Sequence, residues 1–247
     1  EMSDVCIKRK IRNRLLDAGE NIFVQSDDKN TDGYKSLKAR AEANEAFGAE
    51  LKNGKKADAQ RGYEIACKEW MDVRSFGQVF AFKGSDLSLG IRGPVSVQPA
   101  FSVDPIDITS MQITKSVNSE DKEGKSSDTM GMKHRVDFGV YILKGSINVQ
   151  LSEKTGFTEE DAEKIKEAIR TLFVNDSSSA RPDGSMVMHK LYWWKHNCKI
   201  GQYSSHKVHN SIEIKKKEGV RNPRKIEDYE IICHELPGLA VEEYEGL

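Results

Sequence analysis

Apolar residues recur with a helical period in two stretches of the chain. In residues 3–16 and 158–173 most of them fall three or four positions apart, which places them on one face of a helix. Ser3 or Asp4 can cap the first stretch by accepting hydrogen bonds from unpaired amides. Thr158 and Asp161 have the spacing of a capping box at the start of the second stretch. We therefore predict helices over 3–16 and 158–173, and we assign the apolar stripe of the second helix to the core.

Two further stretches have a helical composition. Residues 34–51 and 58–71 are rich in Ala, Glu, Lys and Leu, and they flank a polar turn at 53–56. We predict two helices there whose charges face water. Residues 27–33 are a polar loop that resembles a calcium-binding loop only superficially, because the required spacing of acidic residues is not met.

Strand patterns begin after residue 72. Alternation of apolar and polar residues, or runs bracketed by glycine, predicts strands over 73–82, 90–101, 106–117, 136–151, 186–194 and 212–214. The aromatic residues that end 186–194 are either a platform for stacking bases or part of the core, and we favour the core for most of them. We expect a mobile polar loop over 118–128 and an acidic tail over 227–245.

The order of the long elements indicates an α+β fold. Helix, strands, helix and strand correspond to the β-α-β-β-α-β order of a ferredoxin-like fold whose first strand is absent from this chain. A sheet covered by two helices is also the arrangement of the RNA-recognition fold. We predict a single elaborated domain, for which 247 residues provide a sizeable core.

Composition excludes several classes of protein. The formal net charge is −1, so any nucleic-acid binding has to come from local clusters of cations. The four cysteines form no C-x-x-C pair, and we expect reduced thiols in a cytoplasmic protein. We expect no metal, cofactor or membrane span, because the sequence has neither metal-ligand spacing nor a long apolar run.

The densest cluster of cations lies in the first predicted helix. Within seven residues the sequence places Lys8, Arg9, Lys10, Arg12 and Arg14. Lys8 and Arg12 share one face because they are four residues apart, and Arg9 lies beside them. A capped helix start followed by clustered cations suits a phosphate backbone, so Ser3 joins Lys8, Arg9 and Arg12 as a candidate RNA contact. We expect Lys10 and Arg14 to face solvent or a neighbouring protein.

Five short stretches carry a family resemblance. They are DVCIKRKIR (4–12), DVRSFG (72–77), IRGPV (91–95), SVDPI (102–106) and TMGMKH (129–134). In this order they resemble the Cas-seven family, the backbone subunits of type I CRISPR surveillance complexes, and within it the subtype I-C branch most. The resemblance spans about residues 3–215. The family opens with a palm strand and an Asn-Pro-Asn-Gly-Asp-Pro-like loop that this chain lacks, so no RNA contact of that loop can be assigned here.

The resemblance implies a hand-shaped protein with a modified RNA-recognition palm, helical fingers and a thumb hairpin. The implied parts are the palm at 1–19, 73–109 and 137–215, the fingers at 20–72, the thumb at 110–136 and a C-terminal tail at 216–247. The implied function is to oligomerise along guide crRNA in antiviral defence, holding its sugar-phosphate backbone whatever the sequence. The implied partners are guide crRNA, target DNA through the guide, further copies in a helical filament and the other Cascade subunits.

Two more candidate RNA contacts lie beside glycines. Arg74 and Arg92 offer planar guanidinium groups to a phosphate, and glycine permits a close approach of the backbone. The alternative for each is a structural salt bridge within the palm. The two roles are balanced for Arg74, whereas RNA contact is favoured for Arg92.

The thumb supplies the remaining candidates. Met130 and Met132 are flexible apolar side chains that can wedge between nucleotides, with Lys133 and His134 available for contact with the RNA backbone. The alternative is ordinary packing within the hairpin.

The competing function is an RNA endonuclease of the type III backbone kind. Asp121, Asp128 and Asp137 and the six histidines could supply an acid or base. No pair of them has a spacing that demands catalysis, so we predict that the chain is not an enzyme and has no catalytic residue. A stand-alone RNA-recognition module is not indicated, because its aromatic octamer is missing.

Overall fold

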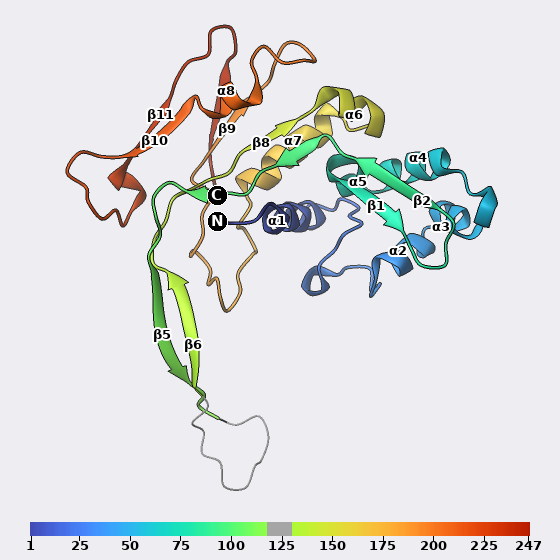
Figure 1. The fold of residues 1–247 in the computed structure, drawn as a ribbon, viewed down its shortest axis with the longest axis horizontal. Helices are drawn as coiled ribbons and strands as arrows, with labels where there is room; N and C mark the ends of the chain where they lie inside the picture. The colour runs from blue at the N-terminus through green and yellow to red at the C-terminus, as the bar shows by residue number, and fades with distance from the viewer. Residues whose placement is uncertain (118–129) are drawn as a thin grey trace.

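Two helices at the centre of the molecule form the first of two hydrophobic cores. The computed structural model describes residues 1–117 and 130–247, and in it α1 (Asp4–Asp17) packs against α7 (Glu159–Arg170) (Figure 1). Ile7, Ile11 and Leu15 of α1 and Ile165 of α7 are at most 2% exposed. Both predicted helices are confirmed. Ser3 is the N-cap of α1, and the capping box of α7 is present.

A second core joins short helices to a hairpin. Its elements are α2 (Leu37–Ala43), α3 (Glu45–Lys52), α4 (Ala59–Glu69), α5 (Met71–Phe76), β1 (Gly77–Ala81) and β2 (Ser88–Arg92), with single turns η1 (Asp27–Lys29) and η2 (Gly54–Lys56). Phe23, Phe47, Trp70 and Phe80 pack their rings together, with centroids 4.7 Å apart for Phe23–Trp70 and 4.8 Å for Phe47–Phe80. This aromatic cluster fixes the helices and the hairpin to one another.

The other strands pair in small antiparallel sheets. The pairs are β3 (Val95–Val97) with β8 (Gly145–Ile147), β4 (Phe101–Ser102) with β7 (Tyr141–Ile142), β5 (Ile108–Thr114) with β6 (Met130–Val136), β9 (Lys190–Trp194) with β12 (Val241–Glu245), and β10 (Ile212–Lys216) with β11 (Tyr229–Cys233). The α+β class is confirmed. Each sheet within the described residues has two strands, so a continuous ferredoxin-like palm sheet stays a prediction.

A short pairing places the start of α1 beside these strands. Met2 and Ala100 form an antiparallel bridge in which each backbone N–H donates to the other's carbonyl at 2.8 Å. Ala100 lies between β3 and β4 and is fully buried. The bridge therefore fixes the entry point of α1 into the first core.

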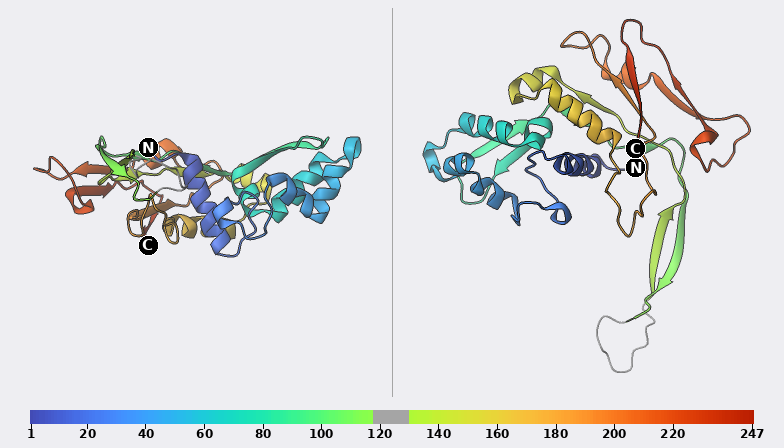
Figure 2. Two further views of the ribbon diagram at one scale, coloured as in Figure 1. Left: turned by 90° about the horizontal axis from the view of Figure 1, so that it is seen from below. Right: turned by 180° about the vertical axis from the view of Figure 1, so that it is seen from behind.

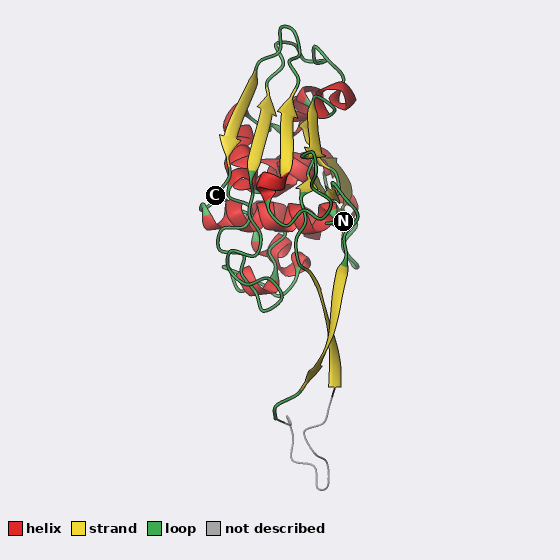
Figure 3. Ribbon diagram, turned by 90° about the vertical axis from the view of Figure 1, so that its left-hand side faces the viewer, coloured by secondary structure: helices red, strands yellow, loops and turns green. Residues whose placement is uncertain are grey.

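One hairpin projects away from the body of the molecule. Strands β5 and β6 extend downward in Figure 1, and Figure 3 shows the same projection from another side. Every residue of β6 is exposed. The strand predicted over 106–117 is confirmed as β5, whereas the loop predicted over 118–128 lies outside the described residues. The hairpin thus presents both of its faces to solvent.

The C-terminal segment is not the tail that its acidic composition suggested. Its residues form the single turn η3 (Ile226–Asp228) and the strands β11 and β12. Strand β11 pairs with β10, which follows the short helix α8 (Ser205–His209), and β12 pairs with β9. Lys166 of α7 lies 3.0 Å from Glu242, and Lys190 of β9 pairs with Glu243. The glutamates of β12 are therefore neutralised by lysines distant in sequence, which the local composition does not reveal.

Three other segments differ from prediction because a cap or a turn residue intervenes. The strand predicted from residue 73 begins only at Gly77, whose φ of 80° ends α5. The strand predicted to run to residue 151 stops where the Asn148 side chain accepts from Leu151 N and starts α6 (Val149–Thr155). The helix predicted over 34–51 is divided in two at Asn44, whose side chain caps α3.

The aromatic residues of β9 do not occupy the position that we favoured. Tyr192, Trp193 and Trp194 are half-buried and belong to neither core. Instead, Lys166 Nζ lies 5.5 Å from the ring centroid of Trp193. Trp193 therefore covers a lysine of α7, while Tyr192 and Trp194 stack on each other with ring centroids 6.2 Å apart.

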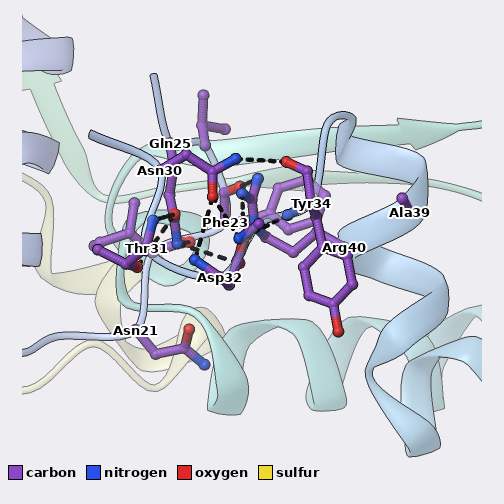
Figure 4. Close-up of polar contacts among 12 residues, drawn as sticks. Asn21, Phe23, Gln25, Asn30, Thr31, Asp32, Tyr34, Ala39 and Arg40 are labelled. Carbon is purple, nitrogen blue, oxygen red and sulfur yellow. Dashed lines mark hydrogen bonds and ion pairs between the residues drawn. The ribbon is translucent and has the colours of Figure 1, made fainter. Parts of the chain in front are cut away.

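The polar loop at residues 25–34 is organised by a buried arginine (Figure 4). Arg40 contacts both carboxylate oxygens of Asp32, at 2.6 and 2.8 Å, and donates to Phe23 O at 2.9 Å. The hydrogen bond from Arg40 holds the pKa of Asp32 below its usual value. Asp32 thus serves as the partner of Arg40.

Asp72 connects the two cores. It is 1% exposed and accepts from Arg12 Nε at 2.9 Å, from Phe23 N at 2.7 Å and from Val24 N at 3.0 Å. Its own helix, α5, places Met71 in the first core and Val73 in the second. One carboxylate therefore joins α1, α5 and the chain entering the second core.

We expect Asp72→Ala to lower the free energy of unfolding by about 3–5 kcal/mol, because it leaves the charge of Arg12 and two amides without their acceptor. Urea denaturation followed by circular dichroism measures the change. The matched control is Asp107→Ala at an exposed position, which should change stability by less than about 0.5 kcal/mol. Equal losses in the two variants would contradict the assigned role of Asp72.

Candidate nucleic-acid interface

The first two turns of α1 present two partly exposed cations. Ser3 Oγ accepts from Cys6 N at 3.3 Å, which leaves the helix capped and its start accessible. Lys8 Nζ lies 3.1 Å from Asp4 of the preceding turn, and Arg9 beside it is half-buried. A surface pair at this spacing contributes only about 0.3–0.5 kcal/mol. A phosphate can therefore replace Asp4 as the partner of Lys8.

Arg9 is the least engaged cation of this cluster. It forms no hydrogen bond or ion pair with the residues that the structure describes, although its charge acts on Asp28. A hydrogen bond with Ser26 lowers the pKa of Asp28, and the charge of Arg9 adds to the effect. Arg9 is therefore available for an additional anionic partner.

Arg12 has a structural role that the sequence did not suggest. Its side chain is 13% exposed, its Nε donates to Asp72 at 2.9 Å, and its guanidinium lies 5.0 Å from the ring centroid of Phe76. Its contact with a phosphate stays a prediction. Any experiment that removes Arg12 must allow for the loss of this interior contact.

The expectation that Lys10 faces solvent or a neighbour is wrong. Lys10 is 2% exposed, pairs with Asp176 and lies 5.4 Å from the ring centroid of Phe173. Arg14 is held by Thr171 Oγ1 and by Asp17, each at 3.1 Å. Both cations therefore attach α1 to the C-terminal end of α7 and the loop after it, so the cluster of five divides into two groups with different roles.

Arg74 makes the salt bridge that was one of its two predicted roles. Its Nε and Nη2 donate to the two carboxylate oxygens of Asp161 at 2.9 and 2.8 Å, which links α5 to the first turn of α7. Burial acts to raise the pKa of Asp161, but the hydrogen bonds from Arg74 and Thr158 outweigh it and lower that pKa. The pair positions the two helices.

Arg92 is exposed at the end of β2, opposite Gly77 in the register. The neighbouring glycines serve the fold: a Cβ on Gly77 would lie 2.2 Å from Ile91 O, and one on Gly93 would lie 2.3 Å from Ser75 O. Glycine is required because the end of α5 approaches the end of β2 this closely. Arg92 forms no ion pair with the described residues, so its guanidinium stays accessible.

The projecting hairpin divides its candidate residues between two faces. Side chains alternate along a strand, so Met130, Met132 and His134 share one face of β6, while Lys133 and Arg135 lie on the other. Met130 is 63% exposed and Met132 is 58% exposed. His134 Nδ1 lies 2.8 Å from Ser110 Oγ of the paired strand. The sequence proposed these residues together, but the register separates apolar from cationic contacts.

The residues considered for catalysis are dispersed or already engaged. Asp121 and Asp128 lie outside the described residues. Asp137 accepts from Thr109 Oγ1 and from Arg135 Nε, each at 2.7 Å. Among residues 1–117 and 130–247, no group of three or more His, Cys, Asp or Glu could hold a metal ion.

No helix in the described part of the chain combines the length and the apolar character needed to span a membrane.

The chain is similar to proteins of one known family over most of its length. The family model described as CRISPR-associated protein Cas7 matches residues 1–234. No curated protein matches the chain. Eighteen chains of solved structures match it. One of them, from "CRISPR RNA-guided surveillance complex, pre-nicking", is 18% identical with a TM-score of 0.35, and the match covers 71% of this chain and 56% of that one. The present chain therefore corresponds to little more than half of that solved chain.

The Arg74–Asp161 pair predicts a specific pH dependence. Because the pKa of Asp161 is lowered from 3.8 on folding, its stabilising contribution is present above about pH 4 and is lost as the pH falls through the lower folded-state pKa. We expect Asp161→Asn to cost about 1.5–3 kcal/mol at neutral pH. Urea denaturation at several pH values should show the gap from wild type narrowing below about pH 4. A gap that is independent of pH would contradict this account.

Proposed function

The chain belongs to the Cas7 family of CRISPR-associated proteins, and we propose that it is a backbone subunit of a type I surveillance complex, closest to the subtype I-C branch. Copies assemble along guide crRNA together with other Cascade subunits. They grip the sugar-phosphate backbone whatever the sequence, and they present the bases for pairing with target DNA. The family match over residues 1–234 carries this proposal.

The projecting hairpin supports assembly between copies. Met130 and Met132 are exposed on one of its faces, and apolar side chains in such a position gain free energy when a partner covers them. We infer that this face reaches the next copy and wedges between nucleotides of the guide, while Lys133 on the other face contacts phosphates. In this role the hairpin is the thumb, and the helical region at residues 20–72 forms the fingers.

The start of α1 supports contact with phosphates. Ser3, Lys8 and Arg9 are accessible together on the first turns, and their chemistry favours anions without selecting a base. Arg92 adds an exposed guanidinium on β2 that forms no ion pair with the residues described. In this proposal the subunit holds the guide and does not cut nucleic acid.

Substitution of Lys8 and Arg9 tests the guide contact without disturbing Asp72. We expect Lys8→Ala/Arg9→Ala to retain the fold and to reduce the slope of log affinity against log salt by about 1.4, since each lost phosphate contact removes about 0.7 for a single strand. Fluorescence anisotropy with a labelled spacer-length RNA measures the slope. Lys68→Ala/Lys154→Ala, at exposed positions, is the control and should keep the wild-type slope.

Two outcomes of that experiment would contradict the proposal. The first is cleavage of the RNA when magnesium is added, which would favour an endonuclease. The second is strong preference for one RNA sequence, because a guide-holding subunit must accept any spacer.

Substitution of the two methionines tests the assembly contact. We expect Met130→Ala/Met132→Ala to change the free energy of unfolding by less than about 0.5 kcal/mol, because both side chains are exposed. The variant should still bind RNA as single copies but form fewer multi-copy complexes, which mass photometry resolves. Val79→Ala/Val187→Ala removes two apolar side chains of similar exposure elsewhere and should assemble as wild type does. Equal assembly by all three proteins would exclude this role for the methionines.

A further inference from the structure

The end of β10 and the exposed loop that follows it concentrate positive charge. Residues 215–225, hereafter the basic loop, contain six cations and one acid, Glu218, and therefore carry a formal charge of about +5. All six cations are exposed: Lys215, Lys216, Lys217, Arg221, Arg224 and Lys225. Lys215 lies 3.7 Å from Glu213 and Lys216 lies 3.2 Å from Asp104. The other four cations form no ion pair with the described residues.

The conformation of the basic loop is held by its own backbone and by one carboxylate. Asp228 accepts from the backbone N–H of Arg224 at 2.8 Å and of Lys225 at 3.2 Å. Lys217 N donates to Asp228 O at 2.9 Å, and Val220 N donates to Lys217 O at 3.1 Å. Asp228 thus holds the backbone of the loop, and the side chains of the neighbouring cations stay exposed. A loop whose backbone is already ordered loses less conformational entropy on binding than a mobile loop does.

The basic loop is attached to the base of the projecting hairpin. Tyr229 donates to Asp104 at 2.7 Å, and its ring lies 6.4 Å from that of Phe138. A hydrogen bond from Thr109 lowers the pKa of Asp137, and the charges of Arg135 and Arg224 contribute to the same shift. The charge of Arg224 thus reaches Asp137 at the base of the hairpin, and Lys216 of the basic loop pairs with Asp104 beside that base at 3.2 Å.

The basic loop and α1 lie on opposite sides of this hairpin base. In Figure 1 the loop between β10 and β11 is on the left of the hairpin and α1 is on the right, and both views of Figure 2 keep the hairpin between them. A strand that runs along the start of α1 therefore does not cover the basic loop. A polyanion bound at the basic loop would therefore be a separate strand.

We propose that the basic loop is a second phosphate-binding surface, which holds a nucleic-acid strand other than the guide on the outer side of the hairpin base. The proposal rests on the proposed function for the presence of a guide on α1. The strand is recognised through its phosphates, because the side chains available are lysine and arginine and no aromatic side chain for stacking occurs in residues 215–225.

The composition of the basic loop favours nucleic acid over an acidic protein. Stable protein interfaces depend on buried aromatic or apolar anchors at their centre. Val220, the loop's one large apolar residue, is half-buried against the protein. The exposed residues of the loop are Lys, Arg, Glu, Gly and Asn. A surface of this kind gains its affinity from counterion release, which polyanionic strands provide.

The test uses the full chain saturated with unlabelled guide RNA, to which a labelled single-stranded DNA unrelated to the guide is added. The variant is Lys217→Ala/Arg221→Ala/Arg224→Ala/Lys225→Ala. We expect it to bind the DNA about tenfold or more weakly than wild type and to lower the salt slope by about 2–3, or about 0.7 for each of four phosphate contacts. Its affinity for labelled guide should be unchanged.

A matched control removes four exposed lysines elsewhere, Lys35→Ala/Lys68→Ala/Lys83→Ala/Lys154→Ala. If this control loses as much DNA affinity as the loop variant, or if neither loses any, the proposal is overturned and the charge of the loop is left for an acidic protein. If the loop variant loses guide affinity to the same extent as DNA affinity, the loop belongs to the path of the guide and the second strand is excluded.

Failure of the proposed function is recognised separately. Wild type that does not bind guide RNA at all would overturn the proposed function. In that event, the affinity of the guide-free wild type for the DNA, compared with that of the loop variant, still decides whether the basic loop binds a nucleic-acid strand.

Discussion

The interior carboxylate of Asp72 is the contact on which the arrangement of the molecule depends. It joins α1 of the first core to Phe23 and Val24 of the chain that enters the second core, beside the weaker links from Ser26 to Asn13 and from Lys29 to Asp17. A buried carboxylate is stable only when its oxygens are fully used, and here one arginine and two backbone amides use them. The same contact turns Arg12 inward and so determines which cations of α1 stay at the surface.

The cations of α1 illustrate how charge is divided between folding and binding. Arg12, Lys10 and Arg14 each have a partner in another segment of the chain, and together they position α1 against α5, α7 and the loop after α7. Lys8 and Arg9 lie on the first turns, where the helix start and its unpaired amides also favour an anion. Of five cations that look alike in the sequence, three are therefore structural and two are accessible, and the division follows from which partners lie nearby.

Sequence patterns predicted the elements whose signals are local. The capping box of Thr158 and Asp161, the apolar stripe of α7 and the cap of α1 by Ser3 all depend on residues within one or two turns. The misassigned charges depended on contacts from far along the chain: Lys10 was assigned to solvent because Asp176 is 166 residues away, and the glutamates of β12 looked like a tail because their lysines lie on α7 and β9. The misplaced ends of other elements depended on single cap or turn residues, Gly77, Asn148 and Asn44. Gly77 and Gly93 were associated with ligand approach, whereas the backbone that comes close is the protein's own. The spacing of apolar and polar residues contains no information on ion pairs between distant segments. Helices and strands were therefore predicted better than the partners of individual cations.

The projecting hairpin has a consequence for the energetics of assembly. A two-stranded ribbon with two open edges and two wet faces is marginally stable by itself, so part of its ordering free energy is deferred until another molecule lies against it. Each added copy would then supply that ordering cost from its own binding energy. In the assembly proposed above, addition of copies would become cooperative, because a hairpin already ordered by one neighbour presents a prepared surface to the next.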